Sequence, residues 1–122
     1  MVNTKSFFAT LAALSLSIGS ATAFTGRASW DVLGTKPCPI ECDKNLDYRV
    51  ALPITLFPNG ERCCERVHVQ YQDRGIDVTF TDLCLSCANS FNISLSHQAF
   101  SQIADLKLGQ IYPVDWTFFP KA

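Results

Sequence analysis

The chain has 122 residues, of which 48% are hydrophobic, and a formal net charge of −1. It has no excess of basic residues for phosphate backbones or an anionic bilayer, so we expect neither nucleic acid nor a membrane as partner. The length fits one small domain, a size at which covalent cross-links add usefully to a modest core.

The N-terminus is typical of a secretory signal peptide. Lys5 supplies a positive charge, residues 7–18 form an apolar run, and Ala21-Thr22-Ala23 is a small-residue cleavage site. The run is shorter than the roughly 20 residues that a membrane-spanning helix needs. We therefore expect residues 1–23 to be a signal peptide and residues 24–122 to form one secreted, extracellular domain. A buried N-terminal helix is the alternative.

Strand patterns begin directly after the expected cleavage site. Residues 24–31 and 47–52 are predicted strands, the second ended by Pro53, and residues 57–60 have turn composition.

A hairpin is predicted in the middle of the chain. Residues 66–71 and 75–81 alternate polar and apolar side chains, with turn residues between them. A turn centred just after Asp73 pairs Val67 with Phe80 and matches every apolar residue with another. A slip of one residue would break all these matches, so the pattern predicts this register.

Six cysteines lie in and around this hairpin, and in an exported protein they favour a disulfide framework. The predicted register places Cys63 opposite Cys84 on the apolar face, whereas Cys64 points away. The remaining cysteines are then paired in the simplest way, although six cysteines allow many connectivities. The predicted bridges are Cys63–Cys84, Cys38–Cys87 and Cys42–Cys64.

A zinc site is the alternative for the same residues. Cys38, Cys42, Cys84 and Cys87 could supply four thiolates in tetrahedral geometry. Export favours disulfides, so we expect no metal and no cofactor. A redox role for Cys84-Leu85-Ser86-Cys87 lacks the strand–helix–strand context that gives this spacing its meaning.

One helix and a last strand close the chain. Ser96 is a good N-cap for a helix over residues 97–104, whose apolar positions share one face. In the last strand, Tyr112 and every second residue to Phe118, including Trp116, are predicted to face the core. About six short strands with a late helix favour a small barrel over a sandwich.

Residues 24–122 resemble the double-psi β-barrel family, which includes RlpA-like, barwin-like and expansin-like domains and glycoside hydrolase family 45. They are most similar to its small secreted members, a bacterial papain inhibitor among them. The likeness is carried by residues 26–31, 50–52, 57–63, 78–87, 94–100 and 104–116. It implies an all-β fold: a six-stranded double-psi β-barrel with one short helix, stapled by disulfides. Cys42 and Cys64 are additional to the cysteines common in the small members, which agrees with a bridge between them.

The resemblance also bears on catalysis. Glycoside hydrolysis normally needs two carboxyl groups, and the family's positions map to Asp31 and Ser94. A serine hydroxyl cannot act as the general acid, so we expect no catalysis there. Asp82 is the candidate substitute for the missing carboxyl group, and the competing role for it is to cap the following loop through backbone N–H groups.

We predict a ligand groove formed by Trp30, Asp31, Tyr48, Asp82 and Ser94, where the two aromatic rings could stack on sugars. Asn92-Ile93-Ser94 is also a glycosylation sequon.

Three functions follow from these features. The first is a secreted, monomeric, non-catalytic protein that binds polysaccharide at a cell wall or host surface. The second is a protein-binding module, such as a protease inhibitor or an effector. The third is a weak glycan-cleaving enzyme that uses Asp31 with Asp82.

Overall fold

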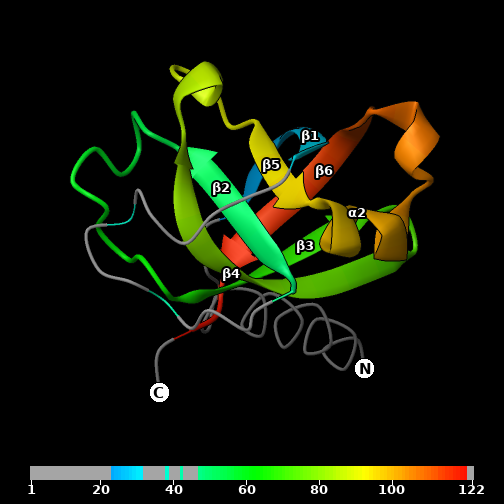
Figure 1. Cartoon of the computed structure of the whole chain (residues 1–122), viewed down its shortest axis with the longest axis horizontal. Helices are drawn as coiled ribbons and strands as arrows, with labels where there is room; N and C mark the ends of the chain where they lie inside the picture. The colour runs from blue at the N-terminus through cyan, green and yellow to red at the C-terminus, as the bar shows by residue number, and fades with distance from the viewer. Residues whose placement is uncertain (1–22, 32–37, 39–41, 43–46, 121–122) are drawn as a thin grey trace, which may run out of the picture.

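A computed structural model describes residues 23–31, 38, 42 and 47–120. The expected signal peptide lies outside this part of the chain except for Ala23. Six strands close into a barrel in the order β1-β5-β2-β4-β3-β6 (Figure 1). The strands are β1 (Phe24–Asp31), β2 (Arg49–Pro53), β3 (Arg66–Tyr71), β4 (Arg74–Cys84), β5 (Ile93–Ser96) and β6 (Gln110–Phe118). The helices are α2 (His97–Ile103) and two short 3₁₀ helices, η1 (Leu85–Cys87) and η2 (Leu106–Leu108).

The barrel combines two kinds of strand pairing. β1 pairs with β5, and β2 with β4, in parallel; the other four neighbouring pairs are antiparallel. Closure pairs the outer strands with each other and so removes the free sheet edges that an open sheet presents. The predicted fold class, an all-β six-stranded double-psi β-barrel with one short helix and disulfides, is confirmed.

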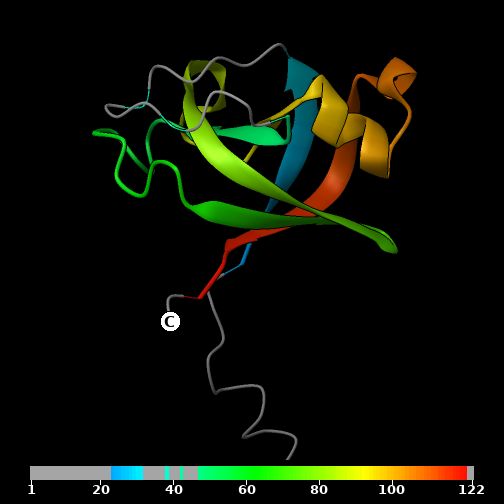
Figure 2. The ribbon, with the colours of Figure 1, turned by 60° about the horizontal axis from the view of Figure 1, so that its bottom comes forward.

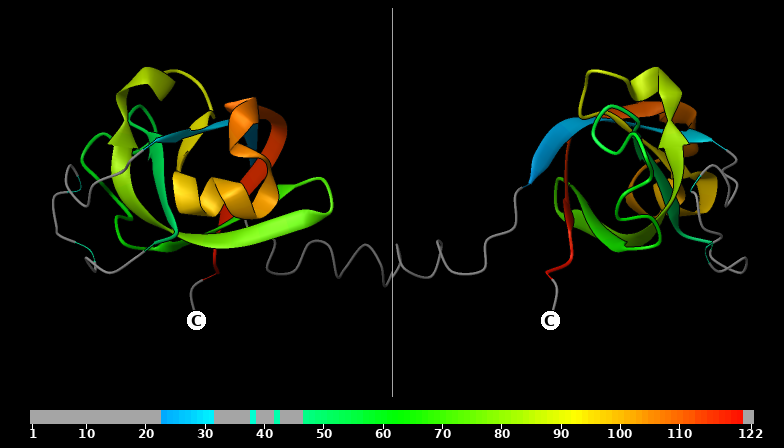
Figure 3. Two further views of the ribbon diagram at one scale, coloured as in Figure 1. Left: turned by 45° about the vertical axis from the view of Figure 1, so that its right-hand side comes forward. Right: turned by 90° about the vertical axis from the view of Figure 1, so that its left-hand side faces the viewer.

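The core fills the barrel and continues under the helix. Trp116, Phe80 and Leu52 are among its largest fully buried side chains. α2 lies across one end of the barrel, as the left view of Figure 3 shows, and buries Phe100 there. The Ser96 hydroxyl accepts a hydrogen bond from the Ala99 N–H at 3.4 Å, which confirms the predicted N-cap. No helix among the described residues is long and apolar enough to cross a membrane.

The hairpin of β3 and β4 projects beyond the barrel (Figure 2), and its register differs from the prediction. Gln72 and Asp73 alone connect the strands, with Gln72 at a φ of 55°, so Val67 pairs with Val78 rather than with Phe80. The register is therefore two residues away from the predicted one. A shift of two residues keeps every side chain on its face, so apolar matching cannot distinguish the two registers, and the tight turn decides between them.

The disulfides also differ from the prediction, which relied on the hairpin register. The bridges are Cys38–Cys63, Cys42–Cys64 and Cys84–Cys87. Cys42–Cys64 is confirmed, whereas the predicted Cys63–Cys84 and Cys38–Cys87 are wrong.

The local backbone explains the pairing. β3 starts only at Arg66, and Cys64, two residues before it, has a φ of 72°, so regular pairing stops before it reaches Cys63. At the end of β4, the chain turns directly into η1 and brings Cys87 back beside Cys84, with 5.2 Å between their Cα atoms. That separation lies in the normal range for a disulfide.

Two irregularities alter the predicted alternation of side chains. In β4, Val50 pairs with Phe80 but Ala51 pairs with Asp82, so Thr81 is an extra residue. Thr81 is fully buried, and Asp82 is turned away from the apolar side on which simple alternation placed it.

β6 has one extra residue, because Tyr112 and Pro113 together oppose Arg27 of β1. Tyr112 was predicted to face the core, but it is 59% exposed, and the buried residues on either side of the irregularity are Ile111 and Val114. A bulge is one of the few places in a sheet that tolerate a proline. It turns the Tyr112 ring outwards over the Arg27 guanidinium.

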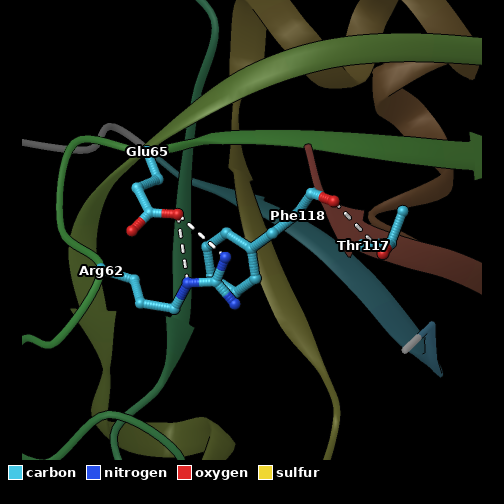
Figure 4. A network of polar contacts seen from close by, with 4 residues as sticks. All are labelled: Arg62, Glu65, Thr117 and Phe118. Atoms are coloured by element: carbon cyan, nitrogen blue, oxygen red, sulfur yellow. Dashed lines mark hydrogen bonds and ion pairs between the residues drawn. The ribbon is translucent and has the colours of Figure 1, made fainter. Parts of the chain in front are cut away.

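The loop between β2 and β3 is attached to the barrel by a polar and aromatic contact. The Arg62 guanidinium lies 3.8 Å from the centre of the Phe118 ring and donates to the Glu65 carboxylate at 2.9 Å (Figure 4). This contact and the bridges from Cys63 and Cys64 together hold the β2–β3 loop in place.

Candidate binding groove

A row of register partners crosses four strands on the outer surface of the barrel. Ser29 of β1 pairs with Ser94 of β5, Ser94 with Ala51 of β2, and Ala51 with Asp82 of β4. Leu95, the neighbour of Ser94, is fully buried in the core, so the row faces outwards. A hollow of about 360 Å³ lies over this row. Its lining comprises Ser29, Trp30, Asp31, Ala51, Asp82, Leu83, Cys84, Leu85, Ser86 and Ser94.

One wall of this groove is the turn after β4. Leu85 and Ser86 of η1 line it, and the Cys84–Cys87 bridge closes the turn at its base. Leu85 is 71% exposed although it is a large apolar residue. The wall therefore combines a fixed backbone with an apolar tip.

Trp30 of β1 is also among the residues that line the groove. The residue is 37% exposed, and its indole N–H donates to the Leu106 carbonyl at 3.0 Å. The His97 ring lies 6.4 Å away. These contacts hold the indole in one orientation while leaving part of it open to solvent, so little side-chain entropy remains to be lost on binding.

Two carboxyl groups line the groove, at different distances from Ser94. Asp31 is on the neighbouring strand and two residues further along, which places its Cα about 8 Å from that of Ser94. A catalytic pair at these positions would need a second carboxyl group at residue 94. The side chain actually present there is a 9% exposed serine.

Asp82 lies further from Asp31 than Ser94 does. β4 is three strand spacings from β1, about 14 Å along the sheet. The Asp82 Oδ1 atom accepts a hydrogen bond from the Leu83 N–H at 2.8 Å. This bond is made to the next residue of the same strand, and it engages the carboxylate with a backbone N–H group.

Four of the five residues predicted for the groove, Trp30, Asp31, Asp82 and Ser94, line the same hollow. Tyr48 is 39% exposed but is not among the described lining residues. Sequence reasoning missed Ser29, Leu85 and Ser86. Alternation along β1 could have revealed Ser29, because it shares a face with Asp31.

A second, smaller hollow of about 110 Å³ continues from the groove and shares Ser29 and Ser86 with it. Arg27, Asn92 and Gln110 supply its other polar side chains. Asn92, which the sequence marked only as a glycosylation site, accepts a hydrogen bond from the Arg27 backbone N–H at 2.9 Å. Among the described residues, no three His, Cys, Asp or Glu side chains are grouped so that they could hold a metal ion.

No protein-family model matches this sequence, and no curated protein matches it significantly. Solved structures do match. The chain is 29% identical to a Streptomyces papain inhibitor, with a TM-score of 0.66 over 80% of this chain and 94% of the inhibitor.

An expansin from Clavibacter michiganensis is also similar. At 20% identity, the TM-score is 0.71 for its apo form and 0.68 for a mutant in complex with cellohexaose. Each alignment covers 83% of this chain but 52% of the expansin, so this chain spans about half of the expansin's length. At this identity the likeness is one of fold. With the closed six-stranded barrel, these neighbours show that the chain has the double-psi β-barrel fold.

Proposed function

We propose that the protein is secreted and binds polysaccharide in the groove without cleaving it. The observation that carries this proposal is the exposed, hydrogen-bonded Trp30 ring at the edge of the polar row from Ser29 to Asp82. The expansin of the same fold that was solved in complex with cellohexaose supports it.

The composition of the groove fits a sugar chain. A pyranose ring has one apolar face that packs against an aromatic ring, and its rim of hydroxyls needs hydrogen-bonding partners. Trp30 supplies the aromatic surface, and the serines and carboxylates of the row supply donors and acceptors. The site is an open hollow across the strands rather than an enclosed pocket, which suits a polymer longer than the site.

Ser94 supports binding rather than hydrolysis. Protonation of a glycosidic oxygen needs an acid that titrates near working pH, which a serine hydroxyl does not. Asp82 is occupied by a backbone hydrogen bond and lies far along the sheet from Asp31. If the protein cleaved glycans with these two carboxylates, Asp31→Asn would abolish release of reducing ends; we expect no release from the wild type.

The three disulfides suit an oxidising compartment, and export would place the groove at a cell wall or host surface. The test is retention on insoluble cellulose, chitin and peptidoglycan. We expect at least one of them to retain the protein, and Trp30→Ala to reduce that retention. Tyr48→Ala is the matched control, because Tyr48 is similarly exposed but lies outside the described groove. Failure of all three polymers to retain the wild type would refute the proposal.

Inhibition of a cysteine protease is a second candidate function. It is favoured by the 29% identity to the Streptomyces papain inhibitor over nearly the whole of that chain. A titration of papain activity with micromolar protein tests it. A stoichiometric loss of activity would support inhibition, and full activity at excess protein would exclude papain as the target.

A further inference from the structure

The polar groove has a basic end. Arg27 lies on the outer face of β1, in line with Ser29 and Asp31, and lines the smaller hollow. Its guanidinium stands 5.2 Å from the centre of the Tyr112 ring, which the irregularity in β6 turns outwards. A cation over an aromatic face is held by the quadrupole of the ring. The contact therefore positions the Arg27 charge at the end of the groove.

The smaller hollow is rich in hydrogen-bond donors. The residues that line it include Arg27, Asn92, Gln110, Ser29 and Ser86, whose side chains carry a guanidinium, two amides and two hydroxyls. The Asn92 Oδ1 atom already accepts from the Arg27 backbone, so what Asn92 can offer a ligand is its amide NH₂. A site with this inventory favours an anionic or strongly accepting group.

Charge is separated along the two hollows. Among the described residues that line them, Asp31 and Asp82 carry negative charge in the larger hollow, and Arg27 carries positive charge in the smaller one. Because the hollows share Ser29 and Ser86, one extended ligand can occupy both. An anionic substituent is attracted at the Arg27 end and repelled near Asp31, so it fits in only one place.

The size and charge of the smaller hollow restrict the kind of group that it can bind. The smaller hollow, about 110 Å³, holds only a few water molecules and so takes a substituent rather than a run of sugar rings. The planar fork of a guanidinium matches a carboxylate through two parallel hydrogen bonds.

We propose that the Arg27 hollow is a subsite for the carboxylate of a uronic acid unit. The glycan partner is then an acidic heteropolysaccharide, in which single uronic acids are spaced among neutral sugars that occupy the Trp30 and Asp31 part of the groove. This inference rests on the proposed polysaccharide-binding function.

The test compares three oligosaccharides of one backbone by calorimetric titration at low salt with a chelator present. The first is a xylo-oligosaccharide carrying one glucuronic acid, the second is its carboxyl-reduced analogue, and the third is the unsubstituted oligosaccharide. We expect the acid to bind about tenfold more tightly than its reduced analogue, the usual effect of a charge-assisted hydrogen bond. Added salt should reduce this ratio.

Two arginine variants locate the effect. Arg27→Gln should bring the acid-to-analogue affinity ratio to about one, whereas Arg74→Gln, at the exposed hairpin turn, should keep it. A circular-dichroism melt confirms that both variants are folded.

The possible failures are distinguishable. A ratio near one in the wild type, with measurable binding of the neutral oligosaccharide, overturns the carboxylate subsite and leaves polysaccharide binding standing. A ratio that persists in Arg27→Gln places the carboxylate elsewhere and overturns the assignment. Absence of binding by all three oligosaccharides, together with no retention on insoluble polymers, overturns both proposals.

Discussion

Ala51 of β2 pairs with Asp82 of β4 rather than with Thr81, although Val50 pairs with Phe80 one step earlier. The extra residue, Thr81, takes the interior position, and Asp82 emerges in the groove. With regular alternation the Asp82 carboxylate would face the apolar side, where an unpaired charge costs several kcal/mol. The irregularity thus supplies the groove with a carboxylate that a regular strand would have buried.

The Thr81 side chain itself gives the first prediction. Its Oγ1 atom is buried and has no hydrogen-bond partner among the described residues. Thr81→Val keeps the shape and removes an unsatisfied hydroxyl, so it should leave the free energy of unfolding unchanged or raise it by up to about 2 kcal/mol. Urea unfolding measures the difference. Thr25→Val is the control, because its hydroxyl donates to Asp115 at 2.6 Å, and this variant should lose stability. A loss of more than about 1 kcal/mol in Thr81→Val would reveal a hidden partner for that hydroxyl.

Truncation should mainly reduce stability at Trp116 and mainly reduce glycan binding at Trp30. Trp116 is 1% exposed, stacks on Phe24 and donates its indole N–H to the Phe91 carbonyl. Trp116→Ala should cost about 3–5 kcal/mol, a large part of the stability of a small domain. Trp30→Ala, at the groove edge, should cost far less and weaken glycan binding instead. Paired unfolding and binding assays check this, and equal destabilisation by both variants would contradict a groove role for Trp30.

Loss of the Cys42–Cys64 bridge should reduce stability more, and loss of the Cys84–Cys87 bridge should reduce glycan binding more. Cys42–Cys64 closes a separation of 22 residues and Cys84–Cys87 one of 3. By loop entropy, losing the first should cost about 3 kcal/mol and the second about half as much. The double variant Cys84→Ser/Cys87→Ser loosens the groove wall, so it should weaken glycan binding more than Cys42→Ser/Cys64→Ser does. If Cys42→Ser/Cys64→Ser weakened binding more than Cys84→Ser/Cys87→Ser in an assay on folded protein, η1 would not line the binding site.

His68 makes stability depend on pH. Its Nδ1 lies 2.7 Å from the Asp77 carboxylate and its Nε2 lies 3.0 Å from the Gln70 amide oxygen, so both ring nitrogens face acceptors. The Gln70 amide is oriented by the bond from its NH₂ to the Gln72 carbonyl. The hydrogen bond to Asp77, aided by Gln70, therefore raises the pKa of His68 above 6.5 against the opposing effect of partial burial.

A raised folded-state pKa means that the contribution of His68 to stability is full below the unfolded value. It is lost as pH rises through the folded value. Asp77→Asn should therefore destabilise the protein more at about pH 6 than at about pH 9, and lower the His68 pKa in an NMR titration. An Asp77→Asn effect that is equal at both pH values would show that the pair does not titrate as described.

The sequence predicts those parts of this structure that depend on which face a side chain occupies. Strand β1 and the Ser96 cap follow from the local pattern, and the Cys42–Cys64 bridge agrees with Cys42 and Cys64 being the two cysteines additional to those of the resembling proteins. The hairpin register does not, because a slip of two residues leaves every face unchanged. The Cys63–Cys84 prediction was wrong because it relied on that register.

The candidate site shows the same limit. Trp30, Asp31 and Ser94 could be placed from the resemblance, but the outward turn of Asp82 and Tyr112 depends on single extra residues in β4 and β6. An extra residue in a strand is set by tertiary pairing and leaves no mark in local composition. Arg27 was missed because only that irregularity brings Tyr112 over it.

The most direct test of the central claim, that the outer groove binds sugar, is an NMR titration of the labelled protein with cellohexaose. We expect shifts confined to the groove: the Trp30 indole N–H and the backbone amides of Ser29, Asp82, Ser86 and Ser94. No shifts at saturating ligand, or shifts centred on the β2–β3 loop around Arg62, would contradict it.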